Sequence, residues 1–176
     1  GISAVFYDVG PAAGRISNIR VNYRSGIQKV VAHLHSLGHR RLAYAGHHSA
    51  LGPTNERLTA FLDAVAQCSP AAAHFAATSS DSLDGGRRAA AEILASGFSP
   101  TAIVCVNDFM AAGVLRELHD RRLRVPDDIS VTGFDNIQLA EFLVPSLTTV
   151  HIPRAEIGRL ALNILVPEAS NNGAPP

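Results

Sequence analysis

The sequence has few cysteines and no long hydrophobic run, and both absences exclude classes of protein. Its two cysteines, Cys68 and Cys105, stand far apart without a CxxC spacing. This pattern is typical of reduced, buried thiols rather than of a disulfide framework or a zinc site. No segment approaches the roughly 20 apolar residues that cross a bilayer, and no basic stretch followed by an apolar one opens the chain. We therefore expect a cytoplasmic protein with no membrane partner.

An excess of charge of either sign is also missing. Lysine plus arginine and aspartate plus glutamate each number 15, so the formal net charge is zero. Sequence-independent affinity for DNA comes mainly from clustered basic residues, so this stretch alone is not expected to bind nucleic acid. What is present is typical of a packed domain, because 47% of the 176 residues are hydrophobic and 17% are charged. This length fits one α/β domain with flanking segments.

Segments with strand and helix patterns alternate along most of the chain. The predicted strands are Ala4–Tyr7, Arg41–Gly46, His74–Thr78, Thr101–Val106, Ile129–Phe134 and Leu147–Val150. The predicted helices are Ser25–Gly38, Thr54–Gln67, a segment from about Ser82 to Gly97, Asn107–Arg122 and Pro153–Ile164, whereas Gly10–Ile19 is predicted to be a loop. This alternation predicts a doubly wound α/β fold with a mostly parallel sheet and helices on both faces.

The motifs of several enzyme classes and of metal sites are absent. The chain has no GxGxxG, no GxxxxGK[ST] and no GxSxG sequence, which argues against dinucleotide, P-loop and hydrolase chemistry. His33, His35 and His39 lie close together, but Gly38 ends the predicted helix between the last two. We interpret them as polar residues at a helix terminus, so the sequence indicates no metal, no cofactor and no catalytic residue.

Polar residues follow several of the predicted strands. Segment 79–84, Asn107-Asp108 and Asp135-Asn136 each come directly after a strand, so they should gather at the carboxyl edge of the sheet. Their convergence favours binding of a hydroxyl-rich ligand. Taken singly, Asn107 and Ser80 are better explained by helix capping, and only the set favours binding. The pair at 47–48 also follows a strand and could line a pocket, although two solvated loop histidines are the preferred interpretation.

Several ordered motifs resemble those of LacI/GalR-type transcription regulators. They are HLHSLGHRRLA at 33–43, ERLTAF at 56–61, TAIVCVND at 101–108, LRVPDDISVTGFDN at 123–136 and PSLTTV at 145–150. The resemblance runs from about Val5 to Leu165 and is specific in its order and spacing.

This resemblance implies one part of a two-lobed, periplasmic-binding-protein-like sensor with a flavodoxin-like strand order. Residues 1–20 would end an N-terminal lobe, 21–150 would form the C-terminal effector-binding lobe, and 151–176 would return to the first lobe. In this family a helix-turn-helix headpiece binds operator DNA as a homodimer, and we expect that headpiece to lie outside this sequence.

The resemblance also implies ligand-binding residues. Arg57 and Asp135 match effector-binding positions, Asn107 matches a polar contact, and Asp8 matches an aspartate across the cleft. A guanidinium or a carboxylate can each bind two adjacent sugar hydroxyls. Asp108 and Asn136 are expected to support these side chains without binding ligand.

The sequence differs from the family pattern at three places, and two further residues fall where family members form dimers. Asp81 stands where several members place a ring-stacking aromatic residue, which favours a hydroxyl-rich or cationic ligand over a purine. Asn22-Tyr23 replaces a usual Asp-Asn, and Ala60 a usual Gly. Ala112 and Leu143 fall where the family dimerises, although local core packing explains them as well.

We therefore hypothesise the effector-binding part of a ligand-controlled transcription regulator, with a sugar or polyol as its small-molecule partner. The alternative is a periplasmic-type sugar-binding receptor of a transporter, which would share the lobes but not the headpiece. The third and least favoured hypothesis is that the protein is an enzyme.

Overall fold

The computed structural model describes residues 4–8, 14–47, 53–68 and 73–166. The chain divides into two compact units, one formed by residues 22–152 and the other by residues 1–21 together with 153–176. No helix in the described part is long and apolar enough to cross a membrane.

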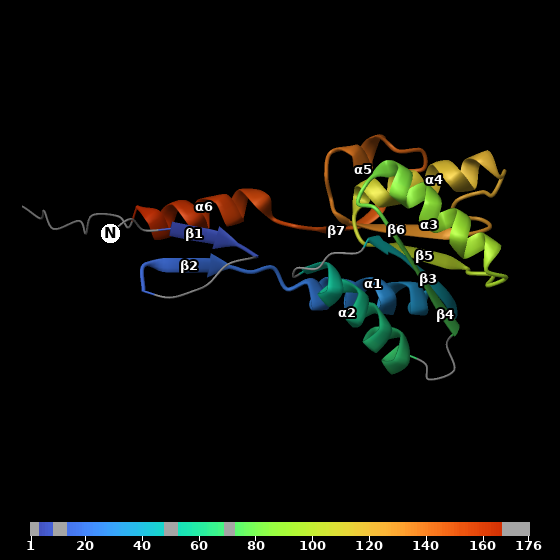
Figure 1. The fold of residues 1–176 in the computed structure, drawn as a ribbon, viewed down its shortest axis with the longest axis horizontal. Coiled ribbons are helices and arrows are strands. Elements are labelled where there is room, and N and C mark those ends of the chain that lie inside the picture. The colour runs from blue at the N-terminus through green and yellow to red at the C-terminus, as the bar shows by residue number, and fades with distance from the viewer. Residues whose placement is uncertain (1–3, 9–13, 48–52, 69–72, 167–176) are drawn as a thin grey trace, which may run out of the picture. The chain divides into compact units, whose positions relative to one another are not determined.

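The larger unit is a five-stranded parallel sheet flanked by helices (Figure 1). Its strands are β3 (Arg41–His47), β4 (Ala73–Ser79), β5 (Ala102–Cys105), β6 (Ser130–Asp135) and β7 (Thr148–His151). Their order is β4-β3-β5-β6-β7. This is the flavodoxin-like order of doubly wound sheets. The predicted fold class is therefore confirmed.

Five helices belong to this unit: α1 (Tyr23–Ser36), α2 (Pro53–Cys68), α3 (Leu83–Ala95), α4 (Asp108–Asp120) and the short α5 (Leu139–Phe142). Neighbouring residues of β6 show that the longer helices cover opposite faces, because strand side chains alternate. A Cβ atom on Gly26 of α1 would meet the ring of Phe134, whereas one on Gly133 would meet the carboxylate of Asp108 in α4. Helices α1 and α2 pack together on one face, and α3 and α4 on the other.

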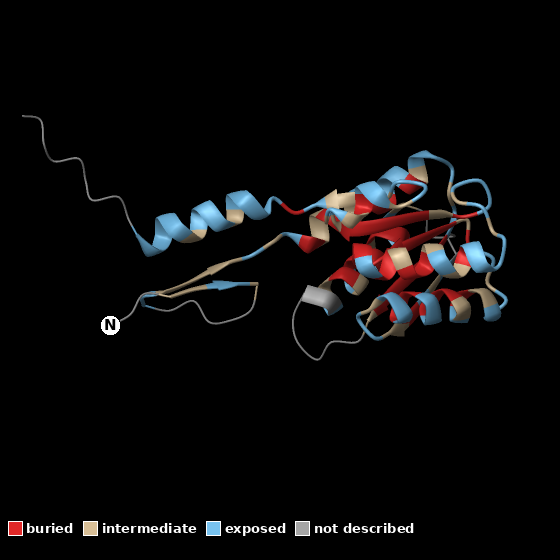
Figure 2. Ribbon diagram, turned by 90° about the horizontal axis from the view of Figure 1, so that it is seen from above, coloured by how far each residue is buried: buried red, intermediate tan, exposed pale blue. Residues whose placement is uncertain are grey.

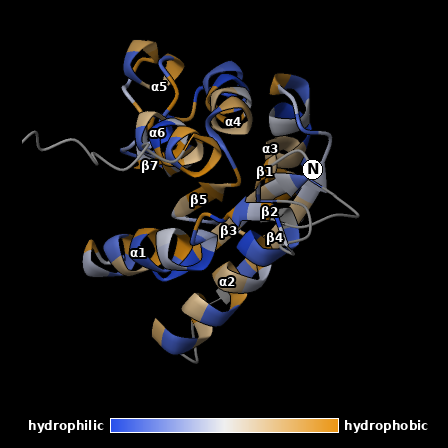
Figure 3. Cartoon of the chain, turned by 90° about the vertical axis from the view of Figure 1, so that its left-hand side faces the viewer, coloured by the Kyte–Doolittle hydropathy of each residue, from blue (hydrophilic) through white to orange (hydrophobic). Residues whose placement is uncertain are grey.

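The core lies between these layers. All four residues of β5 are buried, and β3 and β6 are buried along most of their length (Figure 2). Strand β5 is also strongly hydrophobic along its length (Figure 3). Such a run is typical of a central parallel strand covered on both faces.

The smaller unit contains β1 (Ala4–Tyr7), β2 (Ile16–Ile19) and α6 (Arg154–Leu165). Strands β1 and β2 pair in parallel, with Ala4 opposite Ile16 and Tyr7 opposite Ile19, and α6 packs against both. The predicted loop is therefore wrong over residues 16–19. These four residues follow a segment rich in glycine and alanine, so the loop interpretation continued too far.

The other predicted elements are present with ends shifted by a few residues, whereas α5 had no counterpart among the predictions. Four residues are too few to produce a helical hydrophobic period.

Candidate functional site

The carboxyl ends of the parallel strands carry most of the buried polar side chains. Among the described residues, the buried polar and charged ones are Arg57, Asn107, Asp108 and Thr132. Arg57 lies in α2, the helix that follows β3. Asn107 and Asp108 lie at the start of α4, the helix that follows β5. Buried charge needs compensating partners, so a concentration of it marks this edge as the candidate site.

Arg57 is the central cation of this edge and is only 8% exposed. Its Nη1 donates a hydrogen bond to the backbone oxygen of Val106 at 2.8 Å. Its Nη2 lies 3.8 Å from Oδ1 of Asp135, which is an ion pair too long to be a hydrogen bond. The buried Nε has no hydrogen-bond partner in the structure. The guanidinium therefore retains capacity to donate to a ligand.

Asn107 combines two roles. Its Oδ1 accepts a hydrogen bond from Met110 N at 2.9 Å, which caps α4. Its Nδ2 donates to Oδ1 of Asp81 at 2.7 Å and so orients that carboxylate. Asn107 therefore caps α4 and belongs to the polar cluster at the same time. Ser82, and not Ser80, caps α3 by accepting from Gly85 N.

His47 is a member of this cluster that the sequence interpretation set aside. It ends β3, its side chain is 14% exposed, and its Nε2 lies 3.5 Å from Oδ2 of Asp81. The view of His47 as a solvated loop residue is therefore wrong, and its neighbour at position 48 lies outside the described residues. The signal that could have found it is its place at a strand end, shared with Asp135.

Asp108, the first residue of α4, is fully buried next to this edge of the sheet. Its Oδ2 accepts a hydrogen bond from Ile137 N at 2.8 Å, and its Oδ1 accepts one from Thr149 Oγ1 at 2.5 Å. These contacts tie α4 to the segment after β6 and to β7. Asn136 is exposed, and its Nδ2 lies 3.1 Å from Nδ1 of His151.

Two of the predicted ligand-binding aspartates have an unusual backbone. The φ angle is +60° at Asp8 and +106° at Asp135, and Asn136 follows at +51°. Residues with a side chain rarely adopt these left-handed conformations, which concentrate at functional sites. Asp8 belongs to the smaller unit, where its Oδ1 accepts a hydrogen bond from Val21 N at 3.0 Å. The other predicted site residues belong to the larger unit.

Two further ionisable side chains lie deep in the larger unit. Burial raises the pKa of Tyr44 above its ordinary value, although the charge of Arg57 acts in the opposite direction. Burial also raises the pKa of the Cys105 thiol. Both groups are therefore neutral at physiological pH. In the part of the chain that the structure describes, no group of three histidine, cysteine or acidic side chains is placed to hold a metal ion.

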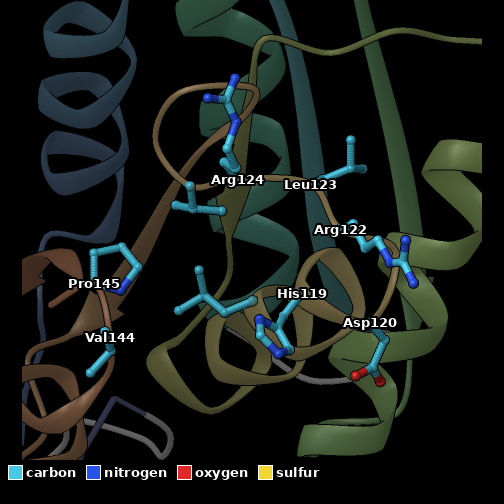
Figure 4. A pocket seen from close by; sticks show the side chains of 9 residues that line it. His119, Asp120, Arg122, Leu123, Arg124, Val144 and Pro145 are labelled. Atoms are coloured by element: carbon cyan, nitrogen blue, oxygen red, sulfur yellow. The ribbon is translucent and has the colours of Figure 1, made fainter.

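A cavity of about 690 Å³ lies elsewhere, at the opposite end of the sheet (Figure 4). Its lining includes His119, Arg122, Val144 and Pro145, from the end of α4 and the loops that follow α4 and α5. None of the predicted ligand-binding residues lines it, and Asp120 and Arg124 there form exposed ion pairs. Buried, incompletely paired charge therefore points to the carboxyl edge rather than to this cavity.

Comparisons with known proteins agree with the fold. Residues 31–176 match the family described as periplasmic binding protein-like domain. The transcriptional repressor PurR of Vibrio cholerae is 34% identical over 166 residues, which are 94% of this chain and 49% of PurR. The regulator GalR of Escherichia coli is 32% identical over 158 residues, which are 89% of this chain and 46% of GalR.

Solved structures give the same result. A LacI family regulator from Arthrobacter in complex with lactose aligns with a TM-score of 0.81 and 31% identity, over 92% of this chain and 60% of that one. A sugar-binding LacI family regulator from Escherichia coli, complexed with phosphate, aligns with a TM-score of 0.80 and 28% identity, over 90% and 58%.

This chain belongs to the periplasmic binding protein-like domain family, and its resemblance to the effector-binding region of LacI/GalR-type regulators is confirmed. It spans about half the length of the curated relatives it matches. These relatives are transcription regulators and not enzymes.

Proposed function

We propose that this chain is the effector-binding part of a cytoplasmic, ligand-controlled transcription regulator that has no enzymatic activity. The effector would be a small hydroxyl-rich molecule such as a sugar or polyol, and operator DNA would be bound by a headpiece outside this sequence. The observation that carries the proposal is the buried guanidinium of Arg57, which lies beside Asp135 and has no hydrogen-bond partner at its Nε. The named relatives favour a regulator over the alternative of a transporter receptor.

The chemistry of the edge supports a neutral, hydroxyl-bearing ligand. Arg57 offers donors, whereas Asp135 and Asp81 offer acceptors, with side chains that are 22% and 52% exposed. A sugar hydroxyl both donates and accepts, so adjacent hydroxyls can pair with a guanidinium on one side and a carboxylate on the other. A ligand that lacks these groups would leave buried charges unpaired, which provides selectivity. The LacI family relative from Arthrobacter was solved with lactose, which has this chemistry.

The proposal is tested with Arg57→Ala and Asp135→Ala in the full-length protein. Thermal unfolding is measured with lactose, galactose, ribose, sorbitol, adenine and guanine, and an operator is selected from random DNA. We expect at least one sugar or polyol to raise the unfolding temperature of the wild type. Each substitution should weaken that binding at least about tenfold, because it removes charge-assisted hydrogen bonds.

Operator affinity without effector should remain unchanged in both variants. Arg116→Ala and Asp127→Ala are matched controls, since both side chains are about two thirds exposed and lie away from the carboxyl edge. A full response in both site variants would refute the site. A response of the wild type to adenine or guanine alone would refute the ligand class.

We also propose a homodimer through a surface that includes Ala112 and Leu143, which are both half-buried. Large hydrophobic side chains are exposed close to them in sequence: Phe109 is 51% exposed, Phe142 71% and Val144 96%. Leu115 of α4 and Val144 line one cavity, which brings α4 and the loop after α5 side by side. Exposed apolar groups of this size are typical of protein interfaces.

Sedimentation velocity of the full-length protein tests this surface. Phe142→Glu should convert the dimer to a monomer, because it places a charge in an apolar interface. Leu37→Glu is the control, since Leu37 is similarly exposed at the end of α1. A dimer that survives Phe142→Glu, or that is lost equally with Leu37→Glu, would contradict the proposal.

A further inference from the structure

Arg57 is held in place by more than its two polar contacts. One carbonyl at 2.8 Å and one carboxylate at 3.8 Å do not replace the water that a guanidinium loses on burial. A buried arginine with such sparse hydrogen bonding requires another source of stabilisation.

That source is a pair of aromatic rings, Tyr23 and Phe134, which we call the aromatic corner. The Cζ of Arg57 lies 4.2 Å from the ring centroid of Tyr23 and 4.7 Å from that of Phe134. The two centroids are 5.7 Å apart, so the rings meet beside the guanidinium and do not sandwich it. Cations within about 6 Å of a ring face are attracted to its electrons, and more strongly when water is excluded. Both rings are buried.

The start of α1 is built around this corner. Asn22 caps the helix by accepting a hydrogen bond from Ser25 N at 2.9 Å, which fixes Tyr23 as the first helical residue. A Cβ at Gly26 would lie 2.7 Å from two atoms of the Phe134 ring, so the missing side chain lets that ring lie against the helix.

The corner also lies next to both places where the chain passes between its compact units. Tyr23 is the second residue after the first passage, between 21 and 22. Asp135, beside Phe134, pairs with His151 in the sheet, and its backbone oxygen accepts a hydrogen bond from Ile152 N just before the second passage. Arg57 is thus in contact with residues adjoining each passage.

We propose that Tyr23 is a positioning residue of the candidate site, which holds the guanidinium of Arg57 by its ring face and directs its free N–H groups toward the ligand. This inference rests on the proposed function for its biological meaning, because Arg57 is the residue assigned to the effector. The contact itself is independent of any effector. Tyr23 would therefore act on recognition through Arg57.

The test observes Arg57 directly, without a ligand. In full-length protein labelled with ¹⁵N in arginine, the Nε–H signal of Arg57 is assigned by its loss in Arg57→Lys. Ring currents from the corner should displace this proton signal upfield of the other arginine signals. Tyr23→Leu should reduce the displacement to the part that the Phe134 ring contributes, and Tyr23→Phe should retain it in full because the ring at 23 remains. Phe98→Leu removes a half-buried ring that stacks on Phe75 and serves as the control.

A double-mutant cycle provides a second measurement. Tyr23→Leu should lower the folding equilibrium constant about 2-fold to 30-fold more when residue 57 is arginine than when it is methionine, which is the range of cation–π contacts. An unchanged Nε–H signal in Tyr23→Leu, or equal effects in the two backgrounds, would overturn the proposal. Neither outcome depends on whether a sugar binds, so this failure is distinguishable from failure of the proposed function.

Discussion

The two ends of the parallel sheet use charged residues in opposite ways. At the carboxyl end, Arg57 and Asp108 are buried, and each contacts specific neighbours. At the amino end, Arg124 and Asp128 form an ion pair at 2.7 Å with side chains 69% and 32% exposed. Exposed pairs contribute little to stability because water already solvates them, whereas buried charges depend on their partners. The carboxyl end is therefore where one substitution can disturb both folding and recognition.

The largest expected effect on stability is that of Asp108→Ala. The substitution leaves the part-buried donors Ile137 N and Thr149 Oγ1 without the buried carboxylate that they contact. We expect the free energy of unfolding to fall by about 2–4 kcal/mol, measured by urea denaturation. Asp127→Ala at the exposed end should change it by less than about 0.5 kcal/mol. Equal effects of the two substitutions would remove the contrast between the ends.

A smaller effect is expected for Arg124→Ala. A hydrogen bond from the Arg124 side chain, and then one from its backbone N–H, lowers the pKa of Asp128 from 3.8 to about 2. The lowered pKa stabilises the fold above pH 3.8, and this contribution is lost as the pH falls through about 2. Wild type and variant should therefore differ slightly at neutral pH and converge near pH 2.

The carboxyl resonance of Asp128 measures this directly in a ¹³C NMR titration. In Arg124→Ala its midpoint should move up toward 3.8, although the backbone hydrogen bond remains. A midpoint that stays near 2 would assign the effect to the backbone alone.

The fold could be predicted because its signals are local. Hydrophobic periods and capping residues mark the long helices, and apolar runs such as Ala102–Cys105 mark the buried strands. Helix α5 was missed because four residues are too few to show a helical period, whereas β2 was missed because ISNI has no apolar run and follows a segment rich in glycine and alanine. The parallel sheet followed from the right-handed crossover rule, whereas the strand order came from the family resemblance.

Only part of the candidate site could be predicted from the sequence. The rule that ligands bind at the carboxyl edge selects Asn107 and Asp135, because Asn107 lies two residues after β5 and Asp135 ends β6. Arg57 came from the resemblance alone. Its contacts with Tyr23 and Phe134 join three separate elements, and no periodicity within one segment reports which side chains meet across a fold.

The left-handed backbone at Asp135 and Asn136 has a consequence for how this domain can change. Glycine adopts such angles without strain, and each non-glycine residue held there costs about 1–3 kcal/mol. A glycine at 135 would thus relax the chain and remove the carboxylate beside Arg57 in the same step. Selection for thermal stability would favour glycine at position 135, whereas selection for effector recognition would favour aspartate. Laboratory evolution for heat resistance alone should therefore replace Asp135, at the end of β6, early and so remove the carboxylate beside Arg57.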